Sequence, residues 1–220
     1  MSYLPCVEVE AKTTADAAVI WMHGLGADGH DFEPLVPHLD LAPGLAVRFV
    51  FPHAPSIPVT LNNGFVMPAW YDIVSLELGR QVDEVQLRAS SAAVGRLIAR
   101  ENERGIASHR IVVAGFSQGG AVGFELALTY PQRLAGLIAL STYFATAPSI
   151  APHPANAGLP IMVGHGSRDP MVAESFGQHS ASQLRALGYA VEYHSYPIEH
   201  SVSMDEIKDI GRFISACLTA

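Results

Sequence analysis

The sequence has few cysteines, few basic residues and no long apolar run. Its 220 residues include two cysteines, Cys6 and Cys217, too few for a disulfide framework or a zinc site. There are 13 Lys and Arg against 21 Asp and Glu, a net charge of −8, without the basic cluster that nucleic-acid binding needs. No stretch is long enough to span a bilayer, and the N-terminus does not resemble a signal peptide. We therefore expect free thiols, no nucleic-acid partner, no stable membrane insertion and a cytoplasmic location.

Apolar runs of strand length alternate along the chain with segments of helical periodicity. The runs are residues 17–22, 48–51, 111–114, 134–141, 161–166 and 191–196, and most lack polar alternation, as is typical of strands buried on both faces of a parallel sheet. Four helices are predicted. Two cover residues 81–104 and 121–130, a third ends before Gly188, and the last begins at a capping box made by Ser203 and Glu206. With 49% hydrophobic residues and no repeat or linker, the chain is expected to form one domain over residues 1–220. Its predicted fold is α/β, a doubly wound, mostly parallel sheet with helices on both faces.

Residues 53–79 interrupt this alternation. Prolines and the turn-forming triplet at 62–64 predict a long irregular excursion. Trp70 and Ile73 lie within it, and both a core position and a pocket wall stay open for them. No large separate lid domain is expected, and whether residues 53–79 act as a mobile lid is left open.

The first catalytic motif follows the apolar run 111–114. Gly115 and Gly119 flank Ser117 in the pattern G-x-S-x-G, and an Ala- and Leu-rich helical segment comes next. A bare G-x-S-x-G also occurs by chance, but the strand-turn-helix context is the one that a nucleophile elbow requires. The sequence therefore predicts Ser117 as a nucleophile at the carboxyl edge of the sheet.

Two further polar loops follow predicted strands. Asp169 comes after the run 161–166, and His200 comes after the run 191–196. A serine hydroxyl needs an imidazole to take its proton and a carboxylate to orient that imidazole. The chain order Ser117, Asp169, His200 is the order of α/β-hydrolases, so these residues are predicted to form a catalytic triad.

Acyl transfer at the serine also requires donors for an oxyanion. The backbone N–H of Gln118, at the start of the predicted helix, is one candidate. The other is the backbone N–H of Leu25 in the glycine-rich loop His23-Gly24-Leu25-Gly26, which follows a buried strand. An ordinary tight turn is the alternative interpretation of that loop.

An acyl channel is the third predicted feature of the site. Met171 and Phe176 follow Asp169 closely and are candidates to line it together with Trp70 and Ile73. Core packing is an equally good interpretation for each of these four side chains.

No metal and no other cofactor are expected. The chain has ten histidines, but no pair has the helical His-x-x-x-His spacing of a zinc site. Asp28 and Asp31 follow the first glycine-rich loop; carboxylates in such places are usually solvated or capping, and we assign them no role.

With these motifs in place, the chain resembles the carboxylesterase and acyl-protein thioesterase family of α/β-hydrolases, also called the phospholipase/carboxylesterase family. The motifs that carry the resemblance run nearly from end to end: His23-Gly24-Leu25-Gly26, Trp70-Tyr71-Asp72, Gly115-Phe116-Ser117-Gln118-Gly119-Gly120-Ala121, His165-Gly166 with Asp169-Pro170, and His200-Ser201. The resemblance implies cofactor-independent hydrolysis of carboxylic esters or thioesters, with the same triad and oxyanion donors. It does not choose the substrate.

The primary functional hypothesis is a serine carboxylesterase that hydrolyses esters of short to medium acyl chains through an acyl-enzyme. An acyl-protein thioesterase or lysophospholipase acting on long acyl chains is the alternative. A peptidase and a non-enzymatic binding module are less favoured, because no gating domain is evident and all three triad residues are present. The expected partner is a small-molecule ester or acyl-thioester substrate, and formation of a homodimer is left open.

Overall fold

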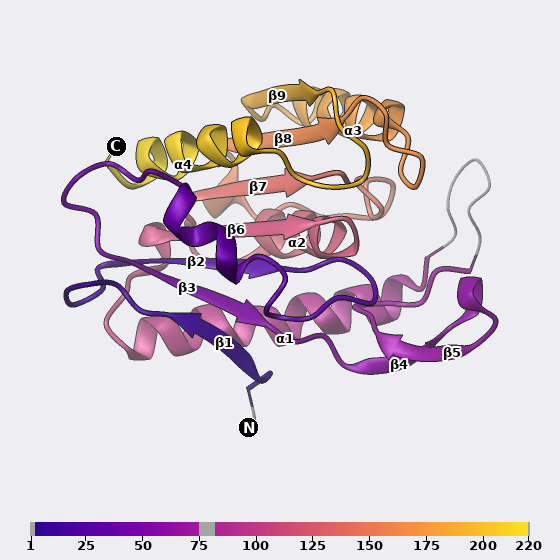
Figure 1. Ribbon diagram of the computed structural model, residues 1–220, viewed down its shortest axis with the longest axis horizontal. Helices are drawn as coiled ribbons and strands as arrows, with labels where there is room; N and C mark the ends of the chain where they lie inside the picture. Colours follow the sequence, from indigo (N-terminus) through magenta and orange to yellow (C-terminus); the bar gives the residue numbers. More distant parts are fainter. Residues whose placement is uncertain (1–2, 75–81, 220) are drawn as a thin grey trace.

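A computed structural model describes residues 3–74 and 82–219 of the chain. In this part of the chain the main sheet has seven strands in the order β1-β3-β2-β6-β7-β8-β9 (Figure 1). Its strands are β1 (Cys6–Val9), β2 (Ala17–Met22), β3 (Val47–Pro52), β6 (Ile111–Phe116), β7 (Gly136–Leu140), β8 (Ile161–Gly166) and β9 (Val191–Tyr196). All neighbouring strands are parallel except β1, which is antiparallel to β3. The predicted α/β fold with a mostly parallel sheet is confirmed.

Helices cover both faces of this sheet. The helices α1 (Glu84–Glu103), α2 (Gln118–Thr129) and α3 (Glu174–Ala186) pack on one face, and α4 (Met204–Thr219) and the 3-10 helix η1 (Glu33–His38) pack on the other (Figure 1). Each face has its own apolar cluster, because successive strand side chains point in opposite directions. On β2, for example, Ile20 joins the first cluster and Trp21 the second. No helix within residues 3–74 or 82–219 is both long and apolar enough to span a membrane.

Most predicted elements lie at or near their predicted bounds. Strands β2, β8 and β9 cover the predicted runs, whereas α2 begins at Gln118 instead of residue 121. Helix α1 begins at Glu84, where the carboxylate of Asp83 caps it by accepting a 2.9 Å hydrogen bond from the N–H of Gln86. Such a cap supplies an acceptor for an N–H that the first turn leaves without one. The predicted start of this helix at residue 81 lies outside the described residues.

The predicted irregular excursion contains a hairpin. Strands β4 (Ser56–Val59) and β5 (Phe65–Pro68) form an antiparallel pair outside the main sheet. The connection between them contains the 3-10 helix η2 (Thr60–Asn62) and ends with Asn63 and Gly64, whose φ of 56° and 75° are left-handed values that Asn and Gly adopt readily. That dipeptide was the available signal, and prolines in both short strands obscured it. The N–H of Gly26 donates to the carbonyl of Pro68 at 2.8 Å, so the hairpin is attached to the first glycine-rich loop.

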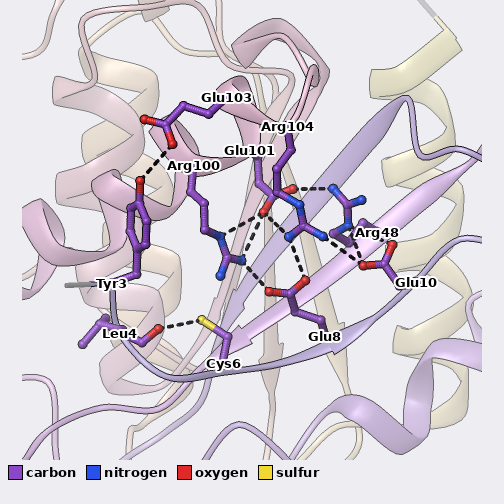
Figure 2. A network of polar contacts seen from close by, with 10 residues as sticks. All are labelled: Tyr3, Leu4, Cys6, Glu8, Glu10, Arg48, Arg100, Glu101, Glu103 and Arg104. Atoms are coloured by element: carbon purple, nitrogen blue, oxygen red, sulfur yellow. Dashed lines mark hydrogen bonds and ion pairs between the residues drawn. The ribbon is translucent and has the colours of Figure 1, made fainter. Parts of the chain in front are cut away.

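Ion pairs join β1 to β3 and α1 at one edge of the sheet (Figure 2). The carboxylate of Glu101 on α1 is fully buried and lies 2.7 Å from the Arg48 guanidinium of β3. The other members of the network are Glu8 on β1 and Glu10 just after it, and Arg100 on α1 and Arg104 at the C-cap of that helix. A buried carboxylate is tolerated when several guanidinium groups compensate its charge. The network therefore connects the antiparallel edge strand, which we did not predict, to the covering helix.

The predicted capping box at the start of α4 forms only in one direction. The hydroxyl of Ser203 accepts a hydrogen bond from the N–H of Glu206 at 3.2 Å, but the Glu206 side chain does not return to Ser203. It is fully buried against Gly164 of β8, where an added Cβ would lie 2.4 Å from Oε1. Neither of its carboxyl oxygens has a hydrogen-bond partner among the described residues. Burial raises the pKa of Glu206 to about 8, so its carboxyl group is mainly protonated at neutral pH.

The raised pKa gives Glu206→Gln a pH-dependent effect on stability. In the native protein Glu206 keeps its proton up to about pH 8, whereas an exposed Glu in the unfolded chain loses it above about pH 4.3. Wild-type stability should therefore fall as pH rises through this window. Between pH 5 and pH 9 we expect the free energy of unfolding of wild type to decrease by about 1 to 4 kcal/mol relative to Glu206→Gln. Urea titrations at several pH values measure this difference.

Asp205→Asn is the matched control, because the Asp205 side chain is 88% exposed in the same turn of α4. Its stability should follow the wild-type pH profile. Parallel profiles for wild type and Glu206→Gln would show that the Glu206 carboxyl is already ionised in the native protein.

Candidate active site

Ser117 lies between the end of β6 and the start of α2 with φ 53° and ψ −118°. A positive φ is uncommon and strained for a residue with a side chain, and surrounding contacts must maintain it. Here the N–H of Ser117 donates to the carbonyl of Leu140 on β7 at 2.8 Å. The Ser117 carbonyl in turn accepts from the hydroxyl of Thr142 at 2.6 Å. These bonds hold the elbow, and the Ser117 side chain lines an open cavity.

The flanking glycines are required by close backbone approaches. A Cβ on Gly115 would lie 2.2 Å from the carbonyl oxygen of Gly119. A Cβ on Gly119 would lie 2.5 Å from the carbonyl oxygen of Met22 at the end of β2. Real Cβ atoms do not approach backbone this closely, so the G-x-S-x-G spacing follows from how β2, β6 and α2 meet.

The structure brings together the three residues predicted as a triad. Nε2 of His200 is 3.1 Å from Oγ of Ser117, and Nδ1 of His200 is 2.6 Å from Oδ2 of Asp169. The His200 ring also packs against Phe116, with 4.7 Å between ring centroids. Because Oδ2 of Asp169 accepts the Nδ1 proton, Nε2 is left free to accept the proton of the serine.

A turn after β8 orients Asp169. Its Oδ1 accepts hydrogen bonds from the N–H groups of Met171 and Val172, both at 2.8 Å, which leaves Oδ2 for His200. Beneath the turn, Nε2 of His165 lies 2.8 Å from the carbonyl of Val172. Burial lowers the pKa of His165, so a neutral ring with its proton on Nε2 donates to that carbonyl. His165 therefore supports the turn that carries the carboxylate.

The two predicted oxyanion donors lie at the same cavity. Leu25 and Gln118 both line it together with Ser117. Within residues 3–74 and 82–219, neither of their backbone N–H groups has a hydrogen-bond acceptor. Unpaired N–H groups beside a nucleophile, one of them at a helix N-terminus, are suited to bind a developing negative charge.

Side chains that we did not assign to the site hold the first glycine-rich loop in place. The N–H of Ala54 donates to Nε2 of His23 at 3.1 Å, which puts the ring proton on Nδ1, where it donates to the carbonyl of Gly24 at 2.7 Å. Burial lowers the pKa of His23 and keeps the ring neutral. The side chain of Gln118 accepts from the N–H of Trp70 at 3.0 Å and donates to the carbonyl of Tyr71 at 2.8 Å. The segment that contains Trp70 is thus bound to the elbow.

The prediction that Trp70 lines an acyl channel is wrong. Its side chain is only 1% exposed, and Nε1 donates to the carbonyl of His23 at 2.8 Å. Trp70 is not among the described residues that line the cavity. Its indole lies beneath the glycine-rich loop because the buried N–H finds a partner there.

The cavity has a volume of about 220 Å³. Its described lining residues are Gly24, Leu25, Ala27, Asp31, Leu61, Ile73, Phe116, Ser117, Gln118, Tyr143, Met171, Val172 and His200. Ile73 and Met171 were predicted. Phe176 was predicted too, but it borders a neighbouring hollow next to Phe144. Tyr143 was missed, although its position just after the carboxyl end of β7 is where α/β sheets place ligand contacts. Within the described residues, no three His, Cys, Asp or Glu side chains are grouped so that they could hold a metal ion.

Comparisons with known proteins agree with this architecture, which is that of an α/β-hydrolase. The family described as Phospholipase/Carboxylesterase matches residues 4–218. The acyl-protein thioesterase 1 of Neurospora crassa is 39% identical over 222 residues, covering 96% of this chain and 91% of the relative. The acyl-protein thioesterase 1 of Mycosarcoma maydis is 37% identical over 221 residues, covering 93% of this chain and 92% of the relative.

A solved structure extends the comparison. The crystal structure of Zea mays acyl-protein thioesterase 2 has a TM-score of 0.86 and 29% identity, covering 98% of this chain and all of that chain. The family match extends over almost the whole chain, and the sequence relatives exceed 30% identity. The chain belongs to the phospholipase/carboxylesterase family of hydrolases.

Proposed function

We propose that the protein hydrolyses acyl thioesters through a covalent acyl-enzyme on Ser117. The observation that supports the chemistry best is the hydrogen-bonded series Ser117, His200, Asp169, with distances of 3.1 and 2.6 Å at the edge of an open cavity. A hydroxyl in such a series is activated as a nucleophile without a metal ion.

Acylation is the first half of the proposed reaction. Nε2 of His200 takes the hydroxyl proton while Oγ of Ser117 forms a bond to the acyl carbon. The carbonyl oxygen becomes an oxyanion, which accepts hydrogen bonds from the N–H groups of Leu25 and Gln118. When the tetrahedral intermediate collapses, the bond from carbon to sulfur breaks, the thiol leaves with the proton from Nε2, and Ser117 holds the acyl group.

Deacylation repeats these steps with water. His200 takes a proton from a water molecule that attacks the acyl carbon, and the same two N–H groups bind the second oxyanion. Collapse breaks the ester bond to Oγ of Ser117, which recovers its proton from Nε2. The carboxylic acid leaves, and Asp169 keeps His200 in the same tautomer throughout.

The choice of thioesters over oxygen esters rests on the relatives. Those described above are called acyl-protein thioesterases, whereas our primary hypothesis from the sequence was a carboxylesterase for short to medium chains. Hydrolysis of a thioester and hydrolysis of an oxygen ester follow the same steps and differ only in the leaving group, which is a thiol or an alcohol. The names therefore favour the alternative hypothesis.

A matched pair of substrates tests this choice. The two substrates are an octanoyl thioester and the octanoyl ester in which oxygen replaces the sulfur. They have the same acyl chain and differ only in the leaving atom. To correct for intrinsic reactivity, kcat/KM of each substrate is divided by its rate constant for hydrolysis by hydroxide. We expect this corrected kcat/KM to be at least about tenfold higher for the thioester, a difference of about 1.4 kcal/mol in transition-state binding. An equal or reversed ratio would support the carboxylesterase hypothesis. Failure to hydrolyse either substrate, with no fluorophosphonate labelling of Ser117, would contradict a serine hydrolase mechanism.

A further inference from the structure

Asp31 is the one acidic residue among the described residues that line the candidate active-site cavity. It lines the cavity together with Gly24, Leu25 and Ala27 of the first glycine-rich loop. Its backbone N–H donates to the carbonyl of Asp28. Its side chain, however, has no hydrogen bond and no ion pair within residues 3–74 and 82–219. This exposed carboxylate, which has no partner in the described part of the chain, is therefore available to interact with a substrate at a mainly apolar cavity.

The Asp31 side chain has no local structural role among the described residues. Asp31 directly precedes Phe32, the N-cap of η1, and no side chain caps that helix. Asp28, three residues earlier, has such a local role, because its Oδ1 accepts from the N–H of His30 at 2.8 Å. Burial and then the nearby Asp28 carboxylate raise the pKa of Asp31, and no positive group within residues 3–74 and 82–219 opposes them.

The residues that line the cavity differ in exposure: buried residues form its inner wall, and exposed residues form its mouth. Ile73, Tyr143 and Val172 are at most 7% exposed and form an apolar inner wall. Met171 is 62% exposed, and Asp31 is exposed as well. An acyl chain gains most free energy against the buried apolar wall, so the polar leaving group remains at the mouth.

The charges of the cavity then indicate what that leaving group carries. No lysine or arginine occurs among its described lining residues, and the chain has a net charge of −8. We propose that Asp31 selects substrates whose leaving group carries a positive charge close to the scissile bond. This inference rests on the proposed function. In an acylated peptide, such a charge would come from a lysine or arginine next to the acylated cysteine.

Two thioesters of equal shape test the proposal in the full-length protein. Butyrylthiocholine carries a trimethylammonium group, and S-(3,3-dimethylbutyl) thiobutyrate replaces it with an uncharged tert-butyl group. The measured quantity is the ratio of kcat/KM for the cationic substrate to kcat/KM for the neutral one. We expect Asp31→Asn to lower this ratio about threefold to tenfold, as for two charges partly screened by water. The change should appear mainly in KM, because the charge attracts substrate and transition state alike.

Three comparisons check the cause of the change. Asp31→Glu keeps the charge and should restore most of the ratio. Asp28→Asn removes one charge from the same loop outside the cavity lining and should leave the ratio within about twofold of wild type. Raising the ionic strength from about 0.02 to 0.5 M should lower the wild-type ratio, since salt screens an exposed charge pair.

An unchanged ratio in Asp31→Asn, or an equal decrease in Asp28→Asn, overturns the proposal. The oxygen esters butyrylcholine and 3,3-dimethylbutyl butyrate give the same comparison if the protein prefers esters to thioesters. A failure of thioester specificity is therefore distinguishable from a failure of charge selection. If none of the four butyryl compounds is hydrolysed, the inference is overturned, and the octanoyl substrates decide the proposed function separately.

Discussion

Replacing Ser117 with alanine is expected to lower kcat/KM for thioesters and esters by about 10⁴ to 10⁶. The reason is the position of the side chain, because Oγ of Ser117 lies 3.1 Å from Nε2 of His200. His200→Ala should have an effect of similar size, since a triad acts as a unit. The double variant should be little slower than either single variant.

The control for this prediction is that Ser117→Ala keeps the native fold. The backbone of Ser117 is held by bonds of its N–H and carbonyl, which alanine retains. The positive φ of 53° is no less accessible to alanine than to serine. Circular dichroism and thermal unfolding should therefore remain close to wild type, while fluorophosphonate labelling disappears. More than a few per cent residual hydrolysis in Ser117→Ala would assign the nucleophile to another residue.

Replacing the backbone amide of Leu25 with an ester is expected to lower kcat by about 10² to 10³ with little change in KM. This exchange, made by semisynthesis, removes the N–H and keeps the side chain. The N–H has no other acceptor in the described part of the chain, so its loss does not break a structural hydrogen bond. One oxyanion-hole donor contributes about 2.7 to 4 kcal/mol to transition-state binding.

Leu25→Ala distinguishes the contribution of the backbone N–H from that of the leucine side chain. It keeps the N–H, so kcat should change much less than in the backbone ester, and any change in chain-length preference would come from the leucine side chain in the cavity. If the backbone ester has the kcat of wild type and a native circular dichroism spectrum, the second oxyanion donor lies elsewhere in the site.

The order of strands and helices could be predicted because it depends on local patterns. Fully buried strands such as β2 and β8 appear as unbroken apolar runs in the sequence. The elbow at Ser117 could be predicted for the same reason, because its strand, turn and helix are contiguous. By contrast, β1 was missed, although Val7 and Val9 alternate with polar residues, because a short edge strand gives a weak signal.

Contacts between distant segments could not be predicted. The burial of Trp70 depends on the carbonyl of His23, 47 residues earlier, and the Glu206 side chain on α4 turns toward Gly164 on β8. In both cases a local motif suggested another role, an acyl channel for Trp70 and a reciprocal capping box for Glu206. For Trp70, packing outweighed the local preference, because burial of a large aromatic side chain is worth more than one exposed hydrogen bond.

The sequence by itself determined the α/β fold class and named the residues from which the candidate site is built, because glycine spacing, apolar runs and the order Ser117, Asp169, His200 are written along the chain. Only the tertiary structure decided which side chains border the cavity, that Tyr143 and Asp31 are among them, and that the carboxylate of Asp31 has no partner in the described part of the chain. The physical reason is that a cavity wall is assembled from the carboxyl ends of several strands, and their relative positions depend on long-range packing that no local pattern encodes.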